Sequence, residues 1–379
     1  MVNFVQIYNK IKTFKLTLLD KYILSQVIGA TLVCLLLFII VWIAPETLFK
    51  IIKKILSDKI TIEMGIKALI FEIPKVLAKA IPVGILLGSI FTFDRLSKNS
   101  ELSILRGSGL SYTRIMTPVI IFGAILSIFC YIVNDKLVPI ASAKLGESKG
   151  GGSHFVYIVE NKDKTPKQNI IVSKFSPEKI SNVTVMNFSP EKYTDAVMFK
   201  SIIFAQSATK TPKAWILNDV LVYEIDDDGI YKKSYHLEKY PILEEGKQAQ
   251  EVFDLMLNTT RKERVFTNHQ ISKYSKLLKK AKFTDEYRYF KTKLYQRYLH
   301  PLTCILFAII GCLLGFAPPR SQRLVGFTIA VGMIFGYYIT LPFFDLLAQK
   351  AVLAPFIAAS FPLILFVISI FIIRKVKDI

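Results

Sequence analysis

The chain has 379 residues, of which 52% are hydrophobic, and its mean hydropathy is +0.41. This composition excludes an ordinary soluble enzyme and indicates a membrane protein with room for several spans and a water-soluble domain. The net charge of +20 would suit nucleic acid or an anionic surface. No basic motif is interleaved with base-stacking aromatic residues, so nucleic-acid binding is not expected.

Six long apolar runs follow one another along the chain, three before and three after a polar region. Such runs match the roughly 20 residues that a helix needs to cross the hydrocarbon core of a bilayer. The first run is too long for a cleavable signal sequence and is interpreted as a retained span. The predicted spans cover residues 22–44, 68–93, 115–133, 299–317, 324–347 and 352–373.

Basic residues flank these spans mainly on one side of the membrane. They are Lys10, Lys12, Lys15 and Lys21 at the start, Arg95, Lys98, Arg106 and Arg114 after the second span, Arg320 and Arg323, and Arg374, Lys375 and Lys377 at the end. The positive-inside rule places this side, with both termini, in the cytoplasm of a cell whose inner membrane holds the chain. The polar region is then periplasmic, although Lys50, Lys53, Lys54 and Lys59 would lie outside against the rule.

Within the polar region the hydrophobic pattern takes a period of two, which is typical of strands. Pro, Asp, Asn and Gly separate six predicted strands, at residues 154–159, 169–175, 183–188, 201–206, 214–224 and 230–236. Six short strands without helices between them predict an all-β sandwich or jelly roll over residues 135–266.

A helical period returns at Thr267, where Ile271, Tyr274, Leu277 and Leu278 form one stripe, and a second helix starts near Thr284. The predicted fold is therefore a multi-pass α-helical membrane protein with six spans, arranged three plus three, and an inserted external jellyroll-like domain. Its parts are residues 1–134 for the first three spans, 135–266 for the β domain, 267–298 for connecting helices and 299–379 for the last three spans.

A short polar island, residues 93–114, separates the second and third spans. Its spacing predicts a helix over residues 98–106, with Ser97 or Asn99 as N-cap and with Gly107 and Gly109 as the stop. Glu101 would lie near the positive end of the helix dipole. The island is either a solvated connector or a coupling helix that docks into a cytoplasmic partner and passes its motion to the spans.

Motifs for catalysis or metal binding are missing from the sequence. There is no nucleotide-binding P-loop, no H-E-x-x-H pair and no nucleophile elbow, and His154, His236, His269 and His300 are scattered. The cysteines Cys34, Cys130, Cys304 and Cys312 all lie in apolar runs, where a thiol is usually a small core hydrophobe. We therefore expect no catalytic residue, no metal and no cofactor in this chain.

Charged residues do occur where charge is expensive. Lys67, Glu72, Lys75 and Lys79 lie in or near the second span and Asp345 lies late in the fifth, and each such group costs roughly 2.5 kcal/mol or more near the bilayer centre. With Lys50, Lys53 and Lys54 they would form a positive collar at the outer mouth of the bundle. These lysines either extend to the lipid headgroups or bind the phosphates of an anionic amphiphile.

Two local segments, IPKVLAKAIPVGILLGSIFTFDRLSKNSELSILRGSGLS at residues 73–111 and APPRSQRLVGF at 317–327, resemble the lipopolysaccharide-export permeases LptF and LptG, the YjgP/YjgQ family. The order of three spans, an external β domain and three spans is similar to that family over essentially the whole chain. The start Asp20-Lys21-Tyr22 and the pair Lys53 and Lys54 are more similar to the LptG type. Lipoprotein-release transporters look different, with four spans.

The resemblance implies two such permeases that form a cavity open to the outer leaflet, driven by a cytoplasmic ATPase dimer (LptB-like) that uses ATP. It implies a periplasmic bridge of similar jellyrolls (LptC/LptA-like) that receives an anionic glycolipid. Matched by position, Glu101 corresponds to the coupling-helix acid that meets the ATPase, and Lys53 and Lys54 correspond to lysines that contact lipid phosphates.

The leading hypothesis is thus a permease subunit that extracts lipopolysaccharide or a similar glycolipid. Its expected ATPase-coupling residues, within 95–109, are Glu101, Leu102, Leu105 and Arg106, and its expected lipid-phosphate ligands are Lys50, Lys53, Lys54 and Lys75. One alternative is a non-transporting envelope scaffold or sensor. Another is a secondary transporter in which the charges of the second span and Asp345 relay ions.

Overall fold

The computed structural model describes residues 17–58, 60–145, 152–160, 165–190, 197–226, 230–244, 246–316 and 324–377. Several residues of the orientation argument lie outside this part: Lys10, Lys12, Lys15, Lys59, Arg320 and Arg323. The chain divides into two compact units, Met1–Ala141 with Arg288–Ile379, and Ser142–Tyr287. We call them the helical unit and the β domain.

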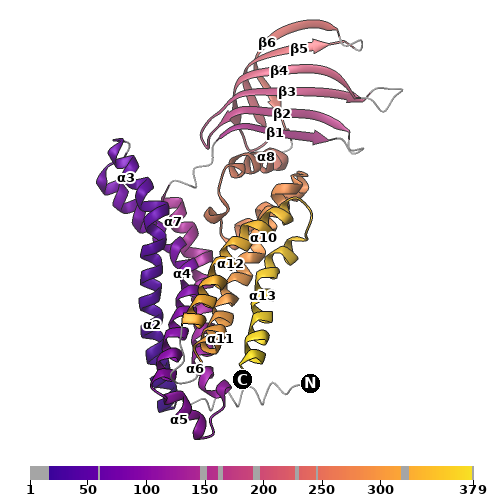
Figure 1. Ribbon diagram of the computed structural model, residues 1–379. Helices are drawn as coiled ribbons and strands as arrows, with labels where there is room; N and C mark the ends of the chain where they lie inside the picture. Colours follow the sequence, from indigo (N-terminus) through magenta and orange to yellow (C-terminus); the bar gives the residue numbers. More distant parts are fainter. Residues whose placement is uncertain are drawn as a thin grey trace. The chain divides into compact units, whose positions relative to one another are not determined.

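The helical unit confirms the six predicted spans, because six described helices are long and apolar enough to cross a membrane. Figure 1 shows α3 and α5 at opposite ends of this unit. The elements before the β domain are α2 (Leu18–Ile43), the π-helical turn η1 (Ala44–Leu48), α3 (Phe49–Leu56), α4 (Ile62–Lys98), α5 (Glu101–Gly107), α6 (Tyr112–Ile132), η2 (Val133–Leu137) and α7 (Val138–Lys144). Those that follow it are α10 (Thr284–Leu299), η4 (His300–Leu302), α11 (Thr303–Gly315), α12 (Leu324–Gln349) and α13 (Pro355–Val376).

Helix α4 lies at the centre of this unit and packs against α2 and α11. Its contacts are close because glycines occupy them: a Cβ at Gly88 would lie 2.6 Å from the backbone nitrogen of Thr31, and one at Gly311 would lie 2.6 Å from the carbonyl oxygen of Leu86. Small residues at the contact let helix backbones approach in a membrane. The tight packing of α4 therefore depends on the missing side chains.

A proline interrupts the hydrogen bonding of α4 in its middle. Pro82 has no N–H, so it cannot donate to the carbonyl of Ala78, one turn earlier. Two side chains from other elements donate to that carbonyl instead, Cys130 Sγ at 3.4 Å and His300 Nε2 at 3.3 Å. Tyr338 donates to the next carbonyl, that of Lys79, at 2.8 Å. Side chains from α6, η4 and α12 thus donate hydrogen bonds to the backbone carbonyls of α4 around this proline.

The β domain contains the six predicted strands, which form one antiparallel sheet in the order β1 to β6. They are β1 (Gly152–Glu160), β2 (Pro166–Phe175), β3 (Ile180–Pro190), β4 (Val197–Lys210), β5 (Trp215–Ile225) and β6 (Tyr231–Ile242). The inserted β domain is confirmed, but its strands are not divided between two packed sheets as in a sandwich. Each strand pairs with the next in sequence, so the sheet is an up-and-down meander.

A bend allows this single sheet to enclose a core. His154, Asn182 and Asp219, on alternate strands, have positive φ angles of 63°, 54° and 57°. The strand register puts them on one line across the sheet. Residues such as Asn, Asp and His adopt this backbone conformation more readily than most. Buried residues of a strand normally lie an even number of positions apart, but Leu217 and Val220, on either side of this line in β5, are both buried although they are three positions apart. Figure 1 shows the strands curving.

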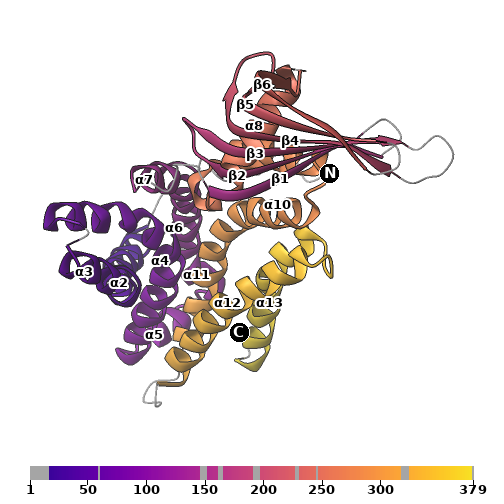
Figure 2. The ribbon, with the colours of Figure 1, turned by 90° about the horizontal axis from the view of Figure 1, so that it is seen from above.

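Helix α8 (Gly246–Thr259) lies within residues 135–266, for which the sequence analysis predicted an all-β domain with its last strand ending at residue 236. The all-β expectation was wrong there. Its buried residues Ala249, Val252 and Met256 repeat every three to four positions, a helical spacing that the strand interpretation overlooked. Trp215 Nε1 donates to the carbonyl of Ala249 at 3.1 Å, which fixes α8 against the sheet. Figure 2 shows α8 behind the strands in the view from above.

The helix α9 (Asn268–Lys280) confirms the helical stripe predicted after Thr267. Thr267 is its N-cap and forms a capping box with Gln270. Ile271, Tyr274 and Leu278 are buried, as the stripe predicted.

Candidate functional site

Helix α5, within the polar island, is shorter than predicted. Helix α4 continues to Lys98 because Phe93 and Leu96 still face its core, and Asn99 is the C-cap of α4. Ser100 then takes a left-handed conformation with φ 60°, and α5 begins at Glu101 without a side-chain cap. The predicted start at residue 98 and the predicted caps, Ser97 or Asn99, are therefore wrong. Gly109, with φ +87°, follows its end.

The expected coupling residues divide between the surface of α5 and its attachment. Glu101 accepts hydrogen bonds from the hydroxyl of Tyr22 in α2 at 2.8 Å and from Asn99 at 3.0 Å. The Arg106 guanidinium lies over the ring of Tyr112 in α6, 3.7 Å from its centroid. These two polar residues hold α5 to two spans while remaining partly accessible.

The apolar residues of α5 face opposite ways. Leu102 is only 6% exposed and, with Leu105, packs into the core of the spans. Ile104, in contrast, is 69% exposed. Leu102 therefore attaches α5 to its own chain, and Ile104, which the sequence analysis did not single out, is the apolar side chain that a partner could contact.

Further contacts join this end of the helical unit to α11 and α13. Phe316, just after α11, packs edge-to-face on Phe93 of α4 and Tyr112 of α6, with ring centroids 5.0 Å and 4.8 Å apart. Ser97 donates to the carbonyl of Gly315 at 3.2 Å. Lys377, after α13, donates to the carbonyl of Leu313 at 2.8 Å, and burial lowers the pKa of its amine. Through these contacts α5 is connected, directly or through one neighbour, to α2, α4, α6 and α11.

A buried ion pair clamps the same end. Arg114, at the start of α6, donates from its two terminal nitrogens to the carboxylate of Asp20 at 2.6 Å and 2.9 Å. Asp20, near the start of α2, is 1% exposed. Such two-bond pairing fixes geometry as well as charge, so α2 and α6 are held together beside α5.

Helix α3, at the opposite end, carries three of the four expected lipid-binding lysines. Successive helical residues are turned by about 100°, which gives α3 three faces. Ile51 and Ile55 face Gly65 of α4. A second face exposes the apolar side chains Phe49, Ile52 and Leu56, and the third exposes Lys50, Lys53 and Lys54. Within the described parts of the chain, no carboxylate pairs with these three lysines.

The lysines of α4 differ from those of α3 because they have partners inside the chain. Lys75 pairs with Glu72, three residues earlier. Lys67 pairs with Glu63 at 2.5 Å, and the ammonium of Lys79 lies 4.9 Å from the ring centroid of Trp42. These charges are compensated inside the chain, whereas those of α3 are available to a ligand.

Asp345, the other costly charge, has partners on a different helix. Its carboxylate pairs with Lys293 of α10 and accepts a hydrogen bond from Gln296 at 2.7 Å. The predicted core role of the thiols is also met, because Cys34, Cys130, Cys304 and Cys312 are buried and free. Among the described residues, no group of three or more His, Cys, Asp or Glu could hold a metal ion.

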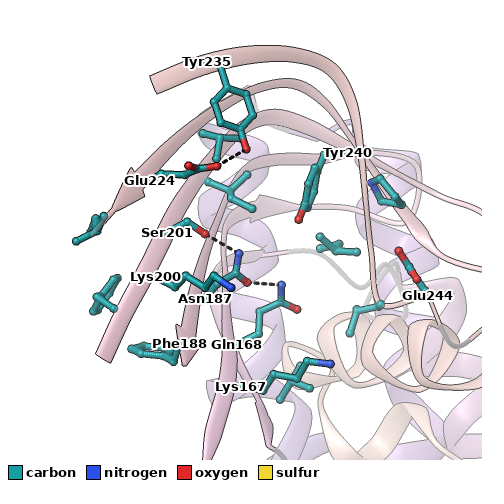
Figure 3. A pocket seen from close by; sticks show the side chains of 18 of the residues that line it. Lys167, Gln168, Asn187, Phe188, Lys200, Ser201, Glu224, Tyr235, Tyr240 and Glu244 are labelled. Carbon is teal, nitrogen blue, oxygen red and sulfur yellow. Dashed lines mark hydrogen bonds between the residues drawn. The ribbon is translucent and has the colours of Figure 1, made fainter. Parts of the chain in front are cut away.

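The β domain contains a cavity of about 900 Å³ on the inner face of its sheet. A row of polar residues crosses five strands, with Gln168, Asn187, Ser201, Glu224 and Lys233 directly opposite one another; we call it the polar rung, and its members other than Lys233 line the cavity. Gln168 donates to Asn187 at 2.8 Å and Asn187 donates to Ser201 at 2.9 Å (Figure 3). The sequence analysis missed this rung, because only the strand register brings its members together.

Comparison with known families gives one match that covers almost the whole chain. The model of a family described as "Lipopolysaccharide export system permease LptF/LptG" matches residues 21–375. Comparison with curated proteins gives no match.

Proposed function

The chain belongs to the LptF/LptG family of lipopolysaccharide export permeases, and from this premise we propose that it couples ATP hydrolysis by a partner to extraction of an anionic glycolipid. The family identifies the chain as the membrane subunit of a transporter and as a component of a lipopolysaccharide export complex. The proposal adds the energy source, the partners and the roles of individual residues: a cytoplasmic ATPase dimer, a second permease of the family and a periplasmic bridge that accepts the lipid.

Energetics favour an external energy source for this transport. Moving an acyl chain from an apolar environment into water costs about 0.8 kcal/mol per methylene, so a lipid with several chains is held strongly both by the leaflet and by an apolar cavity. Expelling it requires work that binding cannot supply. A partner ATPase that compresses the cavity through the spans would provide that work.

The observation that carries the proposal is the attachment of α5. Its exposed face, with Ile104, is open to a partner, while Tyr22, Tyr112 and Leu102 connect it to the spans. Arg106, Arg114 and Lys377 lie at this end, and the positive-inside rule supports a cytoplasmic position for it. The α3 lysines would then lie on the periplasmic side, where they meet the phosphates of the cargo.

The test of coupling is Glu101→Arg in the complete complex, reconstituted with its ATPase and second permease. We expect lipid-stimulated ATP hydrolysis to be lost, because the inverted charge opposes a basic residue of the ATPase, while the purified variant unfolds at the same temperature as wild type. Full lipid-stimulated activity in Glu101→Arg would overturn the coupling role.

Tyr22→Phe is the matched control for this variant. It removes the 2.8 Å hydrogen bond to Glu101 but keeps the carboxylate, so activity should fall by no more than about tenfold. An equal loss in both variants would mean that Glu101 acts on the fold of its own chain and not on the partner.

The role of α3 is tested separately, by replacing Lys50, Lys53 and Lys54 together with Gln. Because charge-assisted contacts to phosphate are among the strongest hydrogen bonds, affinity for lipopolysaccharide in detergent should fall about fivefold or more. Lys67→Gln is the control, since Lys67 already pairs with Glu63. Equal affinities in the triple variant and in Lys67→Gln would exclude the α3 lysines as ligands.

A further inference from the structure

The last turn of α2 marks the level at which the helical unit leaves the hydrocarbon core of the membrane. Helix α2 measures about 39 Å, at 1.5 Å for each of its 26 residues, which exceeds the roughly 30 Å of that core. Trp42 lies in this turn, and tryptophan is enriched at the boundary between the core and the headgroups. Helix α3 begins at Phe49, about two helical turns beyond Trp42, so it lies at the depth of the headgroups.

An apolar face of α3 is exposed at this depth. Phe49, Ile52 and Leu56 are 67%, 41% and 80% exposed, and they span an arc of only about 60° around the helix axis. The π-helical turn η1, which contains Pro45, separates α3 from α2, and proline and π-helical turns are common causes of helix kinks. Figure 1 shows α3 leaning away from the line of α2. The kink thus carries the apolar face to the side of α2.

An exposed stripe of α4 continues this face into the span. The stripe recurs at intervals of four and three residues, on one side of the helix, and consists of Ile62, Ile66, Ile70 and Ile73. Helices α3 and α4 form a hairpin in which Ile51 and Ile55 of α3 face Gly65 of α4. Measured from this contact, the apolar face of α3 and the stripe of α4 are each turned by about 100° in the same sense. Because the two helices run in opposite directions, both lie on the same side of the hairpin.

The lysines of α3 are turned away from this apolar side. Lys50, Lys53 and Lys54 occupy an arc of about 100°. Lys53 borders the apolar face, whereas Lys54 lies about 160° from Ile52 around the axis. An exposed apolar face next to a face of lysines is the composition of a helix that lies in the interface of a membrane.

We propose that the apolar side of the α3–α4 hairpin is inserted into the membrane leaflet that surrounds this end of the spans. The acyl chains that cover Ile73 in the span then extend without a break to Phe49, Ile52 and Leu56. The leaflet holds α3 at a fixed height and leaves its lysines among the headgroups and in water, where a charged ligand can reach them. The inference needs only that the six spans lie in a bilayer, so it does not rest on the proposed function.

The experiment compares the depth of three consecutive positions of α3 by tryptophan fluorescence of the full chain in lipid nanodiscs. The two native tryptophans, Trp42 and Trp215, are replaced by Phe, and a single tryptophan is introduced by Ile52→Trp, Lys53→Trp or Lys54→Trp. The nanodiscs contain phosphatidylcholine that is brominated on its acyl chains close to the headgroup. Bromine quenches a tryptophan that it contacts.

The three variants should differ in a fixed order. An interfacial helix buries its apolar face about 5–10 Å into the boundary between headgroups and acyl chains, so bromine should lower the fluorescence of Ile52→Trp about twofold or more. Lys53→Trp should be quenched less, and Lys54→Trp least. Iodide, a quencher dissolved in the water, should give the reverse order.

Leu37→Trp in the same background is the positive control. Leu37 is exposed on α2, about one and a half turns before Trp42 and therefore inside the core, so bromine must quench it if the lipid reaches the protein. Thermal unfolding in detergent checks the fold of each variant. All three substituted side chains of α3 are exposed, so the variants should unfold at the temperature of their parent.

The proposal is overturned if bromine quenches positions 52, 53 and 54 equally, if it quenches position 54 most, or if it spares position 52 while it quenches Leu37→Trp. A tryptophan at position 52 that neither bromine nor iodide reaches would also overturn it, because a protein surface would then cover the face. None of these outcomes touches the coupling test at Glu101, so the export function and the inserted hairpin can fail independently.

Discussion

The tautomer of His300 follows from the two groups that its ring nitrogens contact. The carbonyl of Ala78 can only accept, so the 3.3 Å contact requires a proton on His300 Nε2. Nδ1 is then free to accept from the hydroxyl of Tyr337 at 2.5 Å. This tautomer satisfies a carbonyl that Pro82 leaves without its helical donor, which explains why a polar ring lies inside an apolar bundle.

Tyr274 predicts how the free energy of unfolding depends on pH. Burial raises the pKa of its hydroxyl to about 12, from an ordinary value of 10.0. As the pH rises, Tyr274 therefore loses its proton at a lower pH in the unfolded chain than in the folded chain. The contribution of neutral Tyr274 to the free energy of unfolding is complete below pH 10 and is lost as the pH rises to about 12. Two pKa units correspond to about 2.7 kcal/mol.

The measurement is urea unfolding of the full protein in a Trp42→Phe background, in which Trp215 is the remaining tryptophan and reports the β domain. Between pH 9 and 12 the loss of unfolding free energy should be smaller in Tyr274→Phe than in the parent. Lysines titrate equally in both proteins, so identical losses would contradict the assignment.

At the scale of an element, the close contact between α4 and α11 predicts the effect of a substitution at Gly311 of α11. A methyl group at Gly311 would meet the carbonyl oxygen of Leu86 at 2.6 Å and Ser89 Cβ at 2.7 Å. Backbone cannot move aside as a side chain can, so Gly311→Ala should lower stability by about 1–3 kcal/mol through overpacking. Thermal unfolding in detergent measures it.

The control is Gly336→Ala, because nothing lies within 4 Å of a Cβ at Gly336. In an open helical position, alanine is favoured over glycine by about 1 kcal/mol, so this variant should be neutral or slightly more stable. If both variants unfold at the same temperature, close approach between α4 and α11 does not stabilise the bundle.

Elements were easier to predict from the sequence than their partners. The six spans follow from the length of the apolar runs and the six strands from a hydrophobic period of two, and all twelve were found. The high cost of Asp345 was also visible, but its partner Lys293 lies 52 residues earlier and no local pattern connects the two. The polar rung was invisible for the same reason, since five strands contribute one residue each.

The island between the second and third spans shows a limit of a different kind. Its charges and glycines correctly marked a short helix, but the division of Leu102 and Ile104 between core and surface depends on the direction in which α5 leaves α4. That direction is set by the left-handed backbone conformation of Ser100. A sequence does not announce this conformation at a serine, because it is uncommon for residues other than glycine. Sequence period alone predicts a helix there, not the face that it presents.

At the scale of the whole molecule, the chain divides into two compact units. The helical unit contains the α5 attachment and the α3 lysines at its opposite ends, and the proposed function assigns the first to the ATPase and the second to the cargo. The β domain has its own core and its own cavity. The helical unit and the β domain can therefore be altered one at a time, which makes the predictions above separable.

The meander of the β domain also determines the order in which the protein can form. Every strand pairs with its neighbour in sequence, whereas Ser97 and Gly315 of the helical unit meet across 218 positions. Structures rich in local contacts fold faster, because little loop entropy is lost before contacts form. During synthesis the sheet can be complete before the last three spans leave the ribosome, so the helical bundle is completed after the inserted domain has folded.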